Sequence, residues 1–137
     1  TEGGLDVTTN FDHLEEVTST LRANNIVVSF FIDPDIHQIK AVAKLGADYV
    51  ELHTGNYANA HELNQVVEEL ERIRSMAMAA SKMGLGVSAG HGLNYQNVVD
   101  VAKIKQIEEL NIGHSIISRA VLIGLENAVR DMIKLIR

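Results

Sequence analysis

The sequence predicts an α/β fold in which one helix precedes four strand–helix units. Three observations support this class. Four short segments are mainly apolar, which is typical of parallel strands covered by helices. Each segment is followed by apolar residues at helical spacing, and glycines end several of these runs. At 137 residues, 46 % of them hydrophobic, the chain is long enough to form one domain with a packed core.

Composition excludes several classes of function. Lys and Arg total 12 against 18 Asp and Glu, a net charge of −6, and the chain has no basic run. Such a chain is not expected to bind nucleic acid or an anionic membrane. The absence of Cys excludes disulfides, thiolate metal sites and a cysteine nucleophile, and it fits a reducing compartment. No apolar run approaches the roughly 20 residues that span a bilayer and no signal-peptide pattern is seen, so we expect a cytoplasmic protein.

The first unit follows a Gly-rich leader and a helix predicted over residues 10–23. Its strand is predicted over residues 26–32, and because this segment is continuously apolar we expect both faces to be covered. Asp33 is expected to cap the next helix, with Pro34 at the first helical position. The side chains of the first helix that we expect to face inward are Phe11, Leu14, Val17 and Leu21.

The second unit contains a strand over residues 49–54, a loop over residues 55–60 and a long helix over residues 61–82. Because side chains alternate along a strand, Tyr49 and Glu51 are expected to share one face. Val50 and Leu52 then take the other face. The predicted buried stripe of the long helix consists of Leu63, Val66, Val67, Leu70, Ile73, Ala77 and Ala80.

The third and fourth units carry the shorter strands, predicted over residues 85–90 and 107–112. Asn94 is a good N-cap, so the helix after the third strand is expected to begin there and to run to about residue 104. A single helix is expected from residue 116 to the C-terminus. Its predicted inward side chains are Ile116, Ile117, Ala120, Val121, Leu125, Ala128, Val129, Met132 and Ile136.

Two architectures fit this order of elements. One is a small doubly wound open sheet, and the other is half of an eight-stranded βα barrel. Length favours the open sheet, because a complete barrel needs about 250 residues. The residues at the strand ends favour the barrel, because a barrel gathers its strand ends around one mouth whereas an open sheet spreads them along a line.

Titratable or Gly-rich groups end all four predicted strands, and chemistry collects beyond the carboxyl ends of parallel strands. Glu51 lies inside an apolar strand, where a carboxylate is rarely buried without a partner or a task. A structural ion pair and a functional acid both remain open for it. His53 continues the same face or forms a hydrogen bond in the loop. The strand-end residues are Asp33, Glu51, His53, Thr54, His91, Gly92, Gly113 and His114.

Two turns, over residues 88–94 and 111–116, each place a histidine beside glycine and open a helix. Such turns form anion cradles from backbone N–H groups and helix dipoles, so the pair predicts a phosphorylated ligand. No GxxxxGK[ST] or GxGxxG pattern occurs, which disfavours a nucleoside triphosphate or dinucleotide. No metal site is expected, because the histidines lack ligand spacing and no HExxH motif is present.

Several longer motifs match one family in order along the whole chain. They are Thr1-Glu2-Gly3-Gly4-Leu5-Asp6-Val7, Phe31-Ile32-Asp33-Pro34-Asp35, Glu51-Leu52-His53-Thr54-Gly55, Ala89-Gly90-His91-Gly92-Leu93 and Glu109-Leu110-Asn111-Ile112-Gly113-His114. The sequence resembles the pyridoxine 5'-phosphate synthase family. The resemblance implies a parallel (β/α)8 TIM barrel of which residues 1–137 form roughly the C-terminal half. The start at Thr1 without an initiator Met fits a piece of a longer chain.

By resemblance, the activity is that of a transferase-type synthase that closes the pyridine ring of vitamin B6. It joins 1-deoxy-D-xylulose 5-phosphate to 3-amino-2-oxopropyl phosphate and releases phosphate and water. The resemblance makes His91 the proton donor and Glu51 the carboxylate that stabilises the transition state. Gly92 is then expected to hold the amino-ketone phosphate, and Gly113 with His114 a substrate or product phosphate. No cofactor is implied, and the family implies a homo-oligomer, an octamer.

The chain also departs from the family pattern. Base and substrate-binding residues that the family carries on earlier strands are missing, so we expect this chain alone to be inactive. No ligand role is assigned to Thr1. One alternative is a non-catalytic half-barrel module that binds phosphate and self-associates through exposed edges and a bare apolar inner face. A small open-sheet signalling domain is the remaining alternative, and only Asp33 and Asp35 support it.

Overall fold

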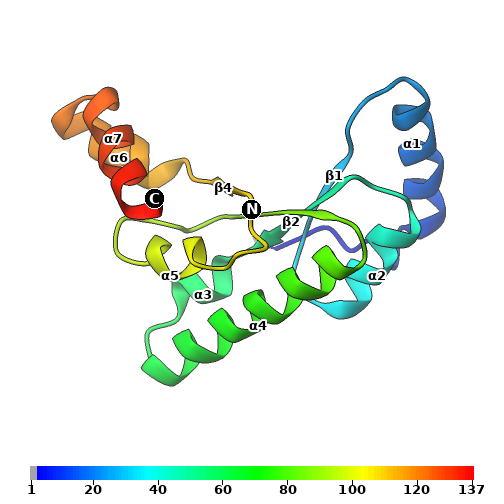
Figure 1. The fold of residues 1–137 in the computed structure, drawn as a ribbon, viewed down its shortest axis with the longest axis horizontal. Coiled ribbons are helices and arrows are strands. Elements are labelled where there is room, and N and C mark those ends of the chain that lie inside the picture. Colours follow the sequence, from blue (N-terminus) through cyan, green and yellow to red (C-terminus); the bar gives the residue numbers. More distant parts are fainter. Residues whose placement is uncertain (1–2) are drawn as a thin grey trace.

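The computed structural model describes residues 3–137, so Thr1 lies outside the described part. Four strands form one parallel sheet in the order β1-β2-β3-β4. Figure 1 shows α1 (Phe11–Ala23) at one end of the molecule and the last two helices at the other. The strands are β1 (Ser29–Ile32), β2 (Tyr49–His53), β3 (Gly86–Gly90) and β4 (Glu109–Asn111).

The strand order decides between the two architectures. A doubly wound sheet reverses its strand order at a switch point, whereas a βα barrel adds each strand beside the previous one. Here the order follows the sequence without reversal, which is consistent with half of a (β/α)8 barrel. The predicted α/β class with one helix and four βα units is confirmed, and the doubly wound alternative is wrong.

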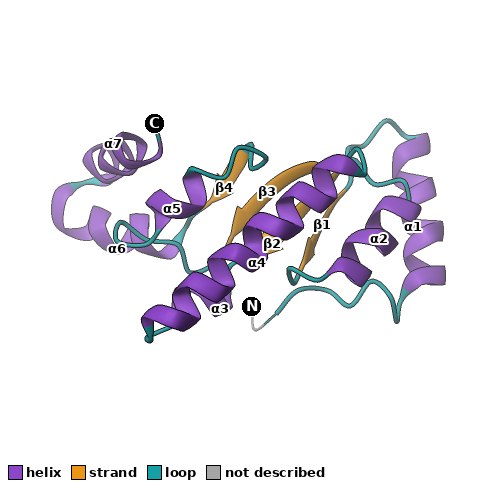
Figure 2. Cartoon of the chain, turned by 60° about the horizontal axis from the view of Figure 1, so that its bottom comes forward, coloured by secondary structure: helices purple, strands orange, loops and turns teal. Residues whose placement is uncertain are grey.

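Within residues 3–137, helices cover one face of the sheet and leave the other open. Right-handed crossovers between strands in sequential order carry every helix to the same side. Figure 2 shows α4 (Leu63–Lys82) lying across the sheet beside α2 (Ile36–Lys44). The expectation that both faces of the first strand are covered is therefore wrong. The buried residues of the helix-covered face are Phe30, Ile32, Val50, Leu52, Val87 and Ala89.

The opposite face of the sheet is mostly polar. It lines a cavity of about 460 Å³. Tyr49 is the exposed aromatic residue there, and most of its neighbours carry hydroxyl, amide or carboxylate groups. The bare apolar inner face that self-association would require is thus not what the structure shows. The residues lining this cavity are Val27, Ser29, Tyr49, Glu51, Ser88, Glu108, Glu109 and Asn111.

The N-terminal cap of α2 lies two residues later than predicted. Asp35, not Asp33, is the N-cap, and its Oδ1 accepts hydrogen bonds from the backbone N–H groups of His37 at 2.8 Å and Gln38 at 3.2 Å. Both aspartates flank Pro34, but only Asp35 stands in the extended conformation directly before the first helical residue. Asp33 is left free for a contact with the next strand.

Two further segments differ from the predicted elements before β3. Residues expected to form a loop make the short helix α3 (Gly55–Asn59). The helix α4 begins at Leu63. Leu63 is 76 % exposed and Val67 is 53 % exposed, so the predicted buried stripe is wrong at these two positions. Ile73, Ala77 and Ala80 are buried as predicted, because the C-terminal part of α4 lies over the sheet.

The elements after β3 show the largest differences. The helix α5 (Val98–Ala102) begins four residues beyond Asn94, whose side chain instead accepts from the backbone N–H groups of Gln96 and Asn97 and holds a turn. The predicted last helix is two helices, α6 (His114–Ile123) and α7 (Leu125–Ile136). Gly124 separates them with φ +83°, which a continuous helix cannot contain.

The exposed side chains of the last two helices also correct the sequence analysis. Of the nine residues predicted to face inward there, Ala128 and Met132 are buried. Because the chain turns at Gly124, α6 and α7 pack chiefly against each other beyond the edge of the sheet. The predicted inward residues that are exposed instead are Ile117, Val121, Leu125, Val129 and Ile136. Within residues 3–137, no helix has both the length and the apolar composition needed to cross a membrane.

Candidate active site at the carboxyl ends of the strands

One cavity of about 590 Å³ lies at the carboxyl ends of the strands. Glu51, His91, Gly92, Gly113 and His114, the five predicted site residues, all line it. Residues far apart in sequence meet there because the parallel strands end on the same side of the sheet. The other lining residues are Phe31, Leu93, Asn94, Asn111, Ile112, Ser115 and Ser118.

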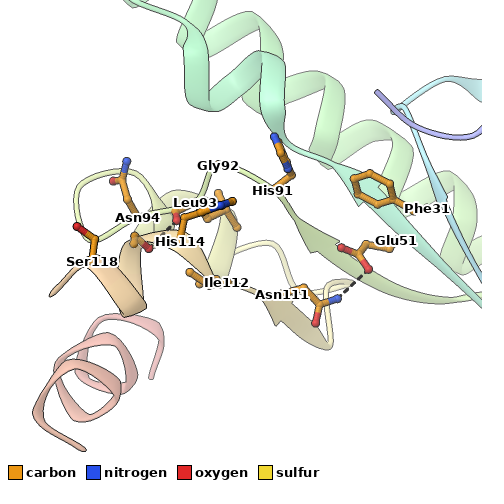
Figure 3. Close-up of a pocket in the computed structure, with 12 residues that line it drawn as sticks. Phe31, Glu51, His91, Gly92, Leu93, Asn94, Asn111, Ile112, His114 and Ser118 are labelled. Carbon is orange, nitrogen blue, oxygen red and sulfur yellow. Dashed lines mark hydrogen bonds between the residues drawn. The ribbon is translucent and has the colours of Figure 1, made fainter. Parts of the chain in front are cut away.

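The cavity has two chemically different ends. Figure 3 shows Phe31, Glu51 and Asn111 at one end and Asn94 and Ser118 at the other, where α6 begins. The first end holds the carboxylate of Glu51, and the second is rich in groups that can donate hydrogen bonds. Such a division suits a ligand with a reacting part and an anionic part.

The carboxylate of Glu51 is held by an amide from another strand. Nδ2 of Asn111 donates to Oε2 of Glu51 at 2.8 Å. Between them runs β3, where Gly90 has no side chain, and a Cβ there would stand 2.5 Å from Oε1 of Glu51. Glycine at position 90 is therefore needed for space. Both Gly90 and Asn111 belong to the sequence motifs described above, but the sequence pattern indicated no role for either.

Glu51 is less acidic than an ordinary glutamate. Burial raises its pKa, the hydrogen bond from Asn111 lowers it, and repulsion from Glu109 raises it again. Within residues 3–137, no Lys, Arg or His side chain forms an ion pair with Glu51. The described structure thus shows no structural ion pair at Glu51, which was one of the two interpretations that the sequence left open; the role as a functional acid stays a prediction.

His91 sits on a strained piece of backbone. Its φ is +80°, in the left-handed region that a side chain rarely adopts, and Gly92 follows with φ +77°. The buried hydroxyl of Thr54 holds this segment through contacts with the carbonyl oxygens of Gly90 at 2.7 Å and His91 at 2.6 Å. Strained residues of this kind persist where the surrounding structure fixes them, which is common at functional sites.

The electrostatic surroundings of His91 favour the neutral imidazole. Burial lowers the pKa of His91, and repulsion from the neighbouring imidazoles of His53 and His114 lowers it further. At neutral pH the ring is therefore mostly uncharged. A negative group that enters the cavity beside the ring would favour its protonation.

Asp33 and His53 lie behind the lining rather than in it. Nδ1 of His53 is 3.1 Å from Oδ1 of Asp33. The ring of His53 packs edge-on against Phe31, with centroids 5.2 Å apart, and lies 4.9 Å from the ring of His91. The sequence placed His53 on this face but could not identify its partners, which come from β1 and from the loop after β3.

The anion-binding end of the cavity is formed by the start of α6. Gly113 precedes this helix, and a Cβ built on it would meet no atom within 4 Å, so the space beside its backbone is open. Ser115 fastens the helix to the loop after β3, because its hydroxyl donates to the carbonyl oxygen of Leu93 at 2.9 Å. The free N–H groups at this helix end favour an anion.

The second helix-end cradle, predicted at Asn94, is not formed as expected. The helix α5 is short and begins at Val98, and the backbone N–H of Asn94 already donates to Oδ1 of Asn97 at 2.8 Å. Of the two predicted helix-end cradles, α6 alone opens into the cavity. Gly92 still lines the cavity from the neighbouring loop. No three His, Asp or Glu side chains come together as a metal site in the described part of the chain.

Comparison with known proteins gives one consistent result. The family model for "Pyridoxal phosphate biosynthesis protein PdxJ" matches residues 1–137. A curated relative from Geobacter sulfurreducens, named pyridoxine 5'-phosphate synthase, is 55 % identical over 137 residues, which are 100 % of this chain and 57 % of that protein. Proteins of the same name from Geotalea daltonii (53 % over 137 residues, 100 % of this chain and 57 % of that protein) and Sulfurihydrogenibium sp. (55 % over 136 residues, 99 % and 56 %) are similar. The chain thus spans a little over half the length of these relatives.

Proposed function

The chain belongs to the family of the pyridoxal phosphate biosynthesis protein PdxJ, and on that premise we propose that it forms part of the active site of a pyridoxine 5'-phosphate synthase. The observation that carries this proposal is the convergence of Glu51, His91 and the start of α6 on one cavity of about 590 Å³. A carboxylate and an imidazole near an anion-binding helix end are the groups that a condensation of phosphorylated substrates needs.

The proposed reaction joins 1-deoxy-D-xylulose 5-phosphate to 3-amino-2-oxopropyl phosphate, with release of phosphate and water as the pyridine ring forms. Condensation of an amine with a carbonyl group and the later eliminations all move protons between carbon, nitrogen and oxygen atoms. These steps call for groups that gain and lose protons near neutral pH. The raised pKa of Glu51 brings this carboxyl group toward that range, whereas the pKa of His91 is lowered in the free protein and needs a bound anion to raise it.

Each lining residue takes a specific part in this proposal. His91 is the proton donor, and Glu51 is the carboxylate that stabilises the transition state. Gly92 contacts the phosphate of the amino ketone. Gly113 and His114 hold a substrate or product phosphate at the start of α6, where backbone N–H groups point toward the ligand.

Substrate binding itself favours protonation of His91, with the proton taken up from solvent. In the free protein, burial and two neighbouring imidazoles keep the pKa of His91 low. A phosphate dianion at the same cavity places negative charge beside the ring, which raises the pKa of a histidine. The binding of a phosphorylated substrate therefore converts a neutral imidazole into a proton donor at the moment of reaction.

We also propose that residues 1–137 alone are inactive, because the rest of the family length supplies further bases and substrate-binding groups. The complete protein is proposed to be a cytoplasmic homo-oligomer, an octamer by resemblance, with no cofactor. Light scattering of the complete protein tests the assembly.

The alternative function, a self-associating phosphate-binding module, is favoured by one observation. Val121 and Leu122 on α6 are 82 % and 86 % exposed, and exposed apolar side chains of this kind mark interaction surfaces. Sedimentation of the 137-residue chain separates the cases. A stable monomer would count against the module. A dimer of the 137-residue chain that binds inorganic phosphate would support it, provided that the complete protein forms no product from the two substrates.

The experiment that tests the main proposal is an assay of the complete protein with both substrates. Formation of pyridoxine 5'-phosphate, with release of phosphate, is the expected result, and Glu51→Gln is expected to abolish most of it. Formation of no product by a folded complete protein that binds both substrates would contradict the proposal.

A further inference from the structure

His53 is a buried polar group whose presence packing does not explain. Its side chain is 6 % exposed, and Nε2 has no hydrogen-bond partner within residues 3–137. A buried polar atom without a partner lowers stability, and an apolar ring of similar size would avoid that loss. A histidine at position 53 therefore lowers the stability of the fold, so its presence calls for a functional reason.

The surroundings of His53 lead to His91. The Nδ1 atom is held by the exposed carboxylate of Asp33 at 3.1 Å, and Phe31 packs against the ring at 87°. The centroid of the His53 ring lies 4.9 Å from that of the His91 ring, at an interplanar angle of 38°. His91 lines the cavity and His53 does not, so His53 reaches the cavity only through its neighbours.

Gly55 gives this histidine pair its space. A Cβ at this position would stand 2.6 Å and 2.7 Å from Cε1 and Nε2 of His53 and 3.3 Å from Cδ2 of His91. Both rings therefore lie against the first residue of α3. The two imidazoles thus share the space that the absent side chain of Gly55 leaves.

We propose that His53 is a positioning residue for His91, because its imidazole, anchored by Asp33, fixes the orientation of the His91 ring at the edge of the cavity. The proposal rests on the proposed function, in which His91 donates a proton to the substrate. An anchor of this kind matters because a catalytic group displaced by about 1 Å loses about 100-fold in rate.

The charge of the pair supports the same assignment. Oδ1 of Asp33 lies 3.1 Å from Nδ1 of His53, close enough for the carboxylate to orient the ring, as carboxylates orient histidines in other sites. A second proton on His53 would repel one on His91, and this repulsion is one cause of the lowered pKa of His91. The other titratable groups around the pair are Asp33 after β1, Glu51 on β2 and His114 on α6.

The test replaces His53 by Phe in the complete protein. His53→Phe keeps an aromatic ring against Phe31 and His91 but removes the ring nitrogens and with them the contact with Asp33. We expect kcat to fall by about 10-fold to 100-fold with KM nearly unchanged. The matched control is His13→Phe on the exposed face of α1, which should leave kcat at the wild-type value.

A second readout does not depend on activity. Diethyl pyrocarbonate modifies neutral imidazoles, so the pH dependence of His91 modification, followed by peptide mass spectrometry, reports its pKa. His53→Phe should raise this pKa, because a repulsive neighbour is lost. Wild-type values of both kcat and this pKa in the folded variant would overturn the proposal. If the wild-type protein itself forms no product, the proposed function fails while the modification experiment still tests the histidine pair.

Asp33→Asn is a second variant, and we expect it to fold normally because the carboxylate of Asp33 is more than half exposed. The substitution weakens the anchor but keeps both imidazoles. A several-fold fall in kcat with unchanged KM supports the proposal. A wild-type kcat in this variant shows that Asp33 does not position the histidine pair and contradicts the proposal.

Discussion

The side-chain amide of Asn111 donates to Oε2 of Glu51 at 2.8 Å, across the intervening strand β3. The two residues are held in register by the ladder, in which Glu51 pairs with Ser88 and Asn111 with Gly90. The contact therefore makes the position of the carboxylate depend on the pairing of three strands. The carboxylate itself is a residue of β2, but the amide that holds it in place comes from β4.

Gly90→Ala should break this contact. The new Cβ would stand 2.5 Å from Oε1 of Glu51 and 2.9 Å from the carbonyl oxygen of Asn111, so backbone and carboxylate both have to move. We expect a loss of stability of about 1–3 kcal/mol and a fall in kcat. Gly86→Ala is the matched control at the other end of β3, where the Cβ would meet the ring of Tyr49. Denaturant unfolding and kinetics should show both variants destabilised and only Gly90→Ala with reduced activity per folded molecule.

Glu51→Gln should reduce kcat by about 100-fold while leaving the fold intact, because the amide can still accept the hydrogen bond from Asn111. The stability of the variant should also respond differently to pH. A carboxyl group whose pKa is raised on folding stabilises the protein below its ordinary value of 4.5, and this contribution is lost as the pH rises through the folded value. Wild-type stability should thus fall above pH 4.5 relative to Glu51→Gln, as measured by denaturant unfolding across this range. A stability difference independent of pH would argue against the raised pKa.

Substitutions of His91 can separate its chemistry from its backbone. Asn tolerates the left-handed conformation, so His91→Asn should fold normally and lose about 100-fold or more in kcat with KM little changed. His91→Gly should relieve the strained φ of +80° and raise the free energy of unfolding by about 1 kcal/mol, although it is equally inactive. Thermal unfolding and steady-state kinetics check the pair. A fully active His91→Asn variant would remove His91 from the mechanism.

The pH profile should shift when substrate binds. In the free protein the pKa of His91 lies below its ordinary value of 6.5, so kcat/KM should fall as the pH rises through that lower value and the proton donor is lost. A bound phosphate raises the pKa of the ring, so the corresponding limb of kcat should lie at higher pH. The same direction should appear when inorganic phosphate is added and the modification of His91 is followed against pH. If kcat and kcat/KM fall at the same pH, bound phosphate does not raise the pKa of His91.

Gly113→Ala tests the anion-binding end of the cavity. A Cβ at this position meets no protein atom within 4 Å, and its φ of −116° suits any residue, so folding should be unaffected. The methyl group would occupy the space proposed for phosphate, and we expect KM to rise by about 10-fold with unchanged thermal stability. Gly92→Ala is a poor substitute, because φ is +77° and the Cβ would stand 2.6 Å from that of Ala58. An unchanged KM in Gly113→Ala would place the phosphate elsewhere.

Much of the fold follows from local patterns. The alternation around Val50 and Leu52, the helical spacing after each strand and the glycines at turns predicted four βα units in their observed order. The errors are local choices between similar residues. Asp33 and Asp35 are both possible caps beside Pro34, and in the folded chain Asp35 caps the helix while Asp33 lies beside His53.

Residue types and spacing were enough to identify Glu51, His91, Gly92, Gly113 and His114 as strand-end residues, and all five line one cavity. Their proposed roles stay predictions. What sequence patterns could not reveal are the contacts that join separate strands: Asn111 with Glu51, Thr54 with the His91 backbone, and Asp33 with His53. The physical reason is that periodicity reports which face a side chain takes, whereas a contact between strands depends on register, twist and the space that a missing Cβ leaves. Those quantities exist only once the chain has folded.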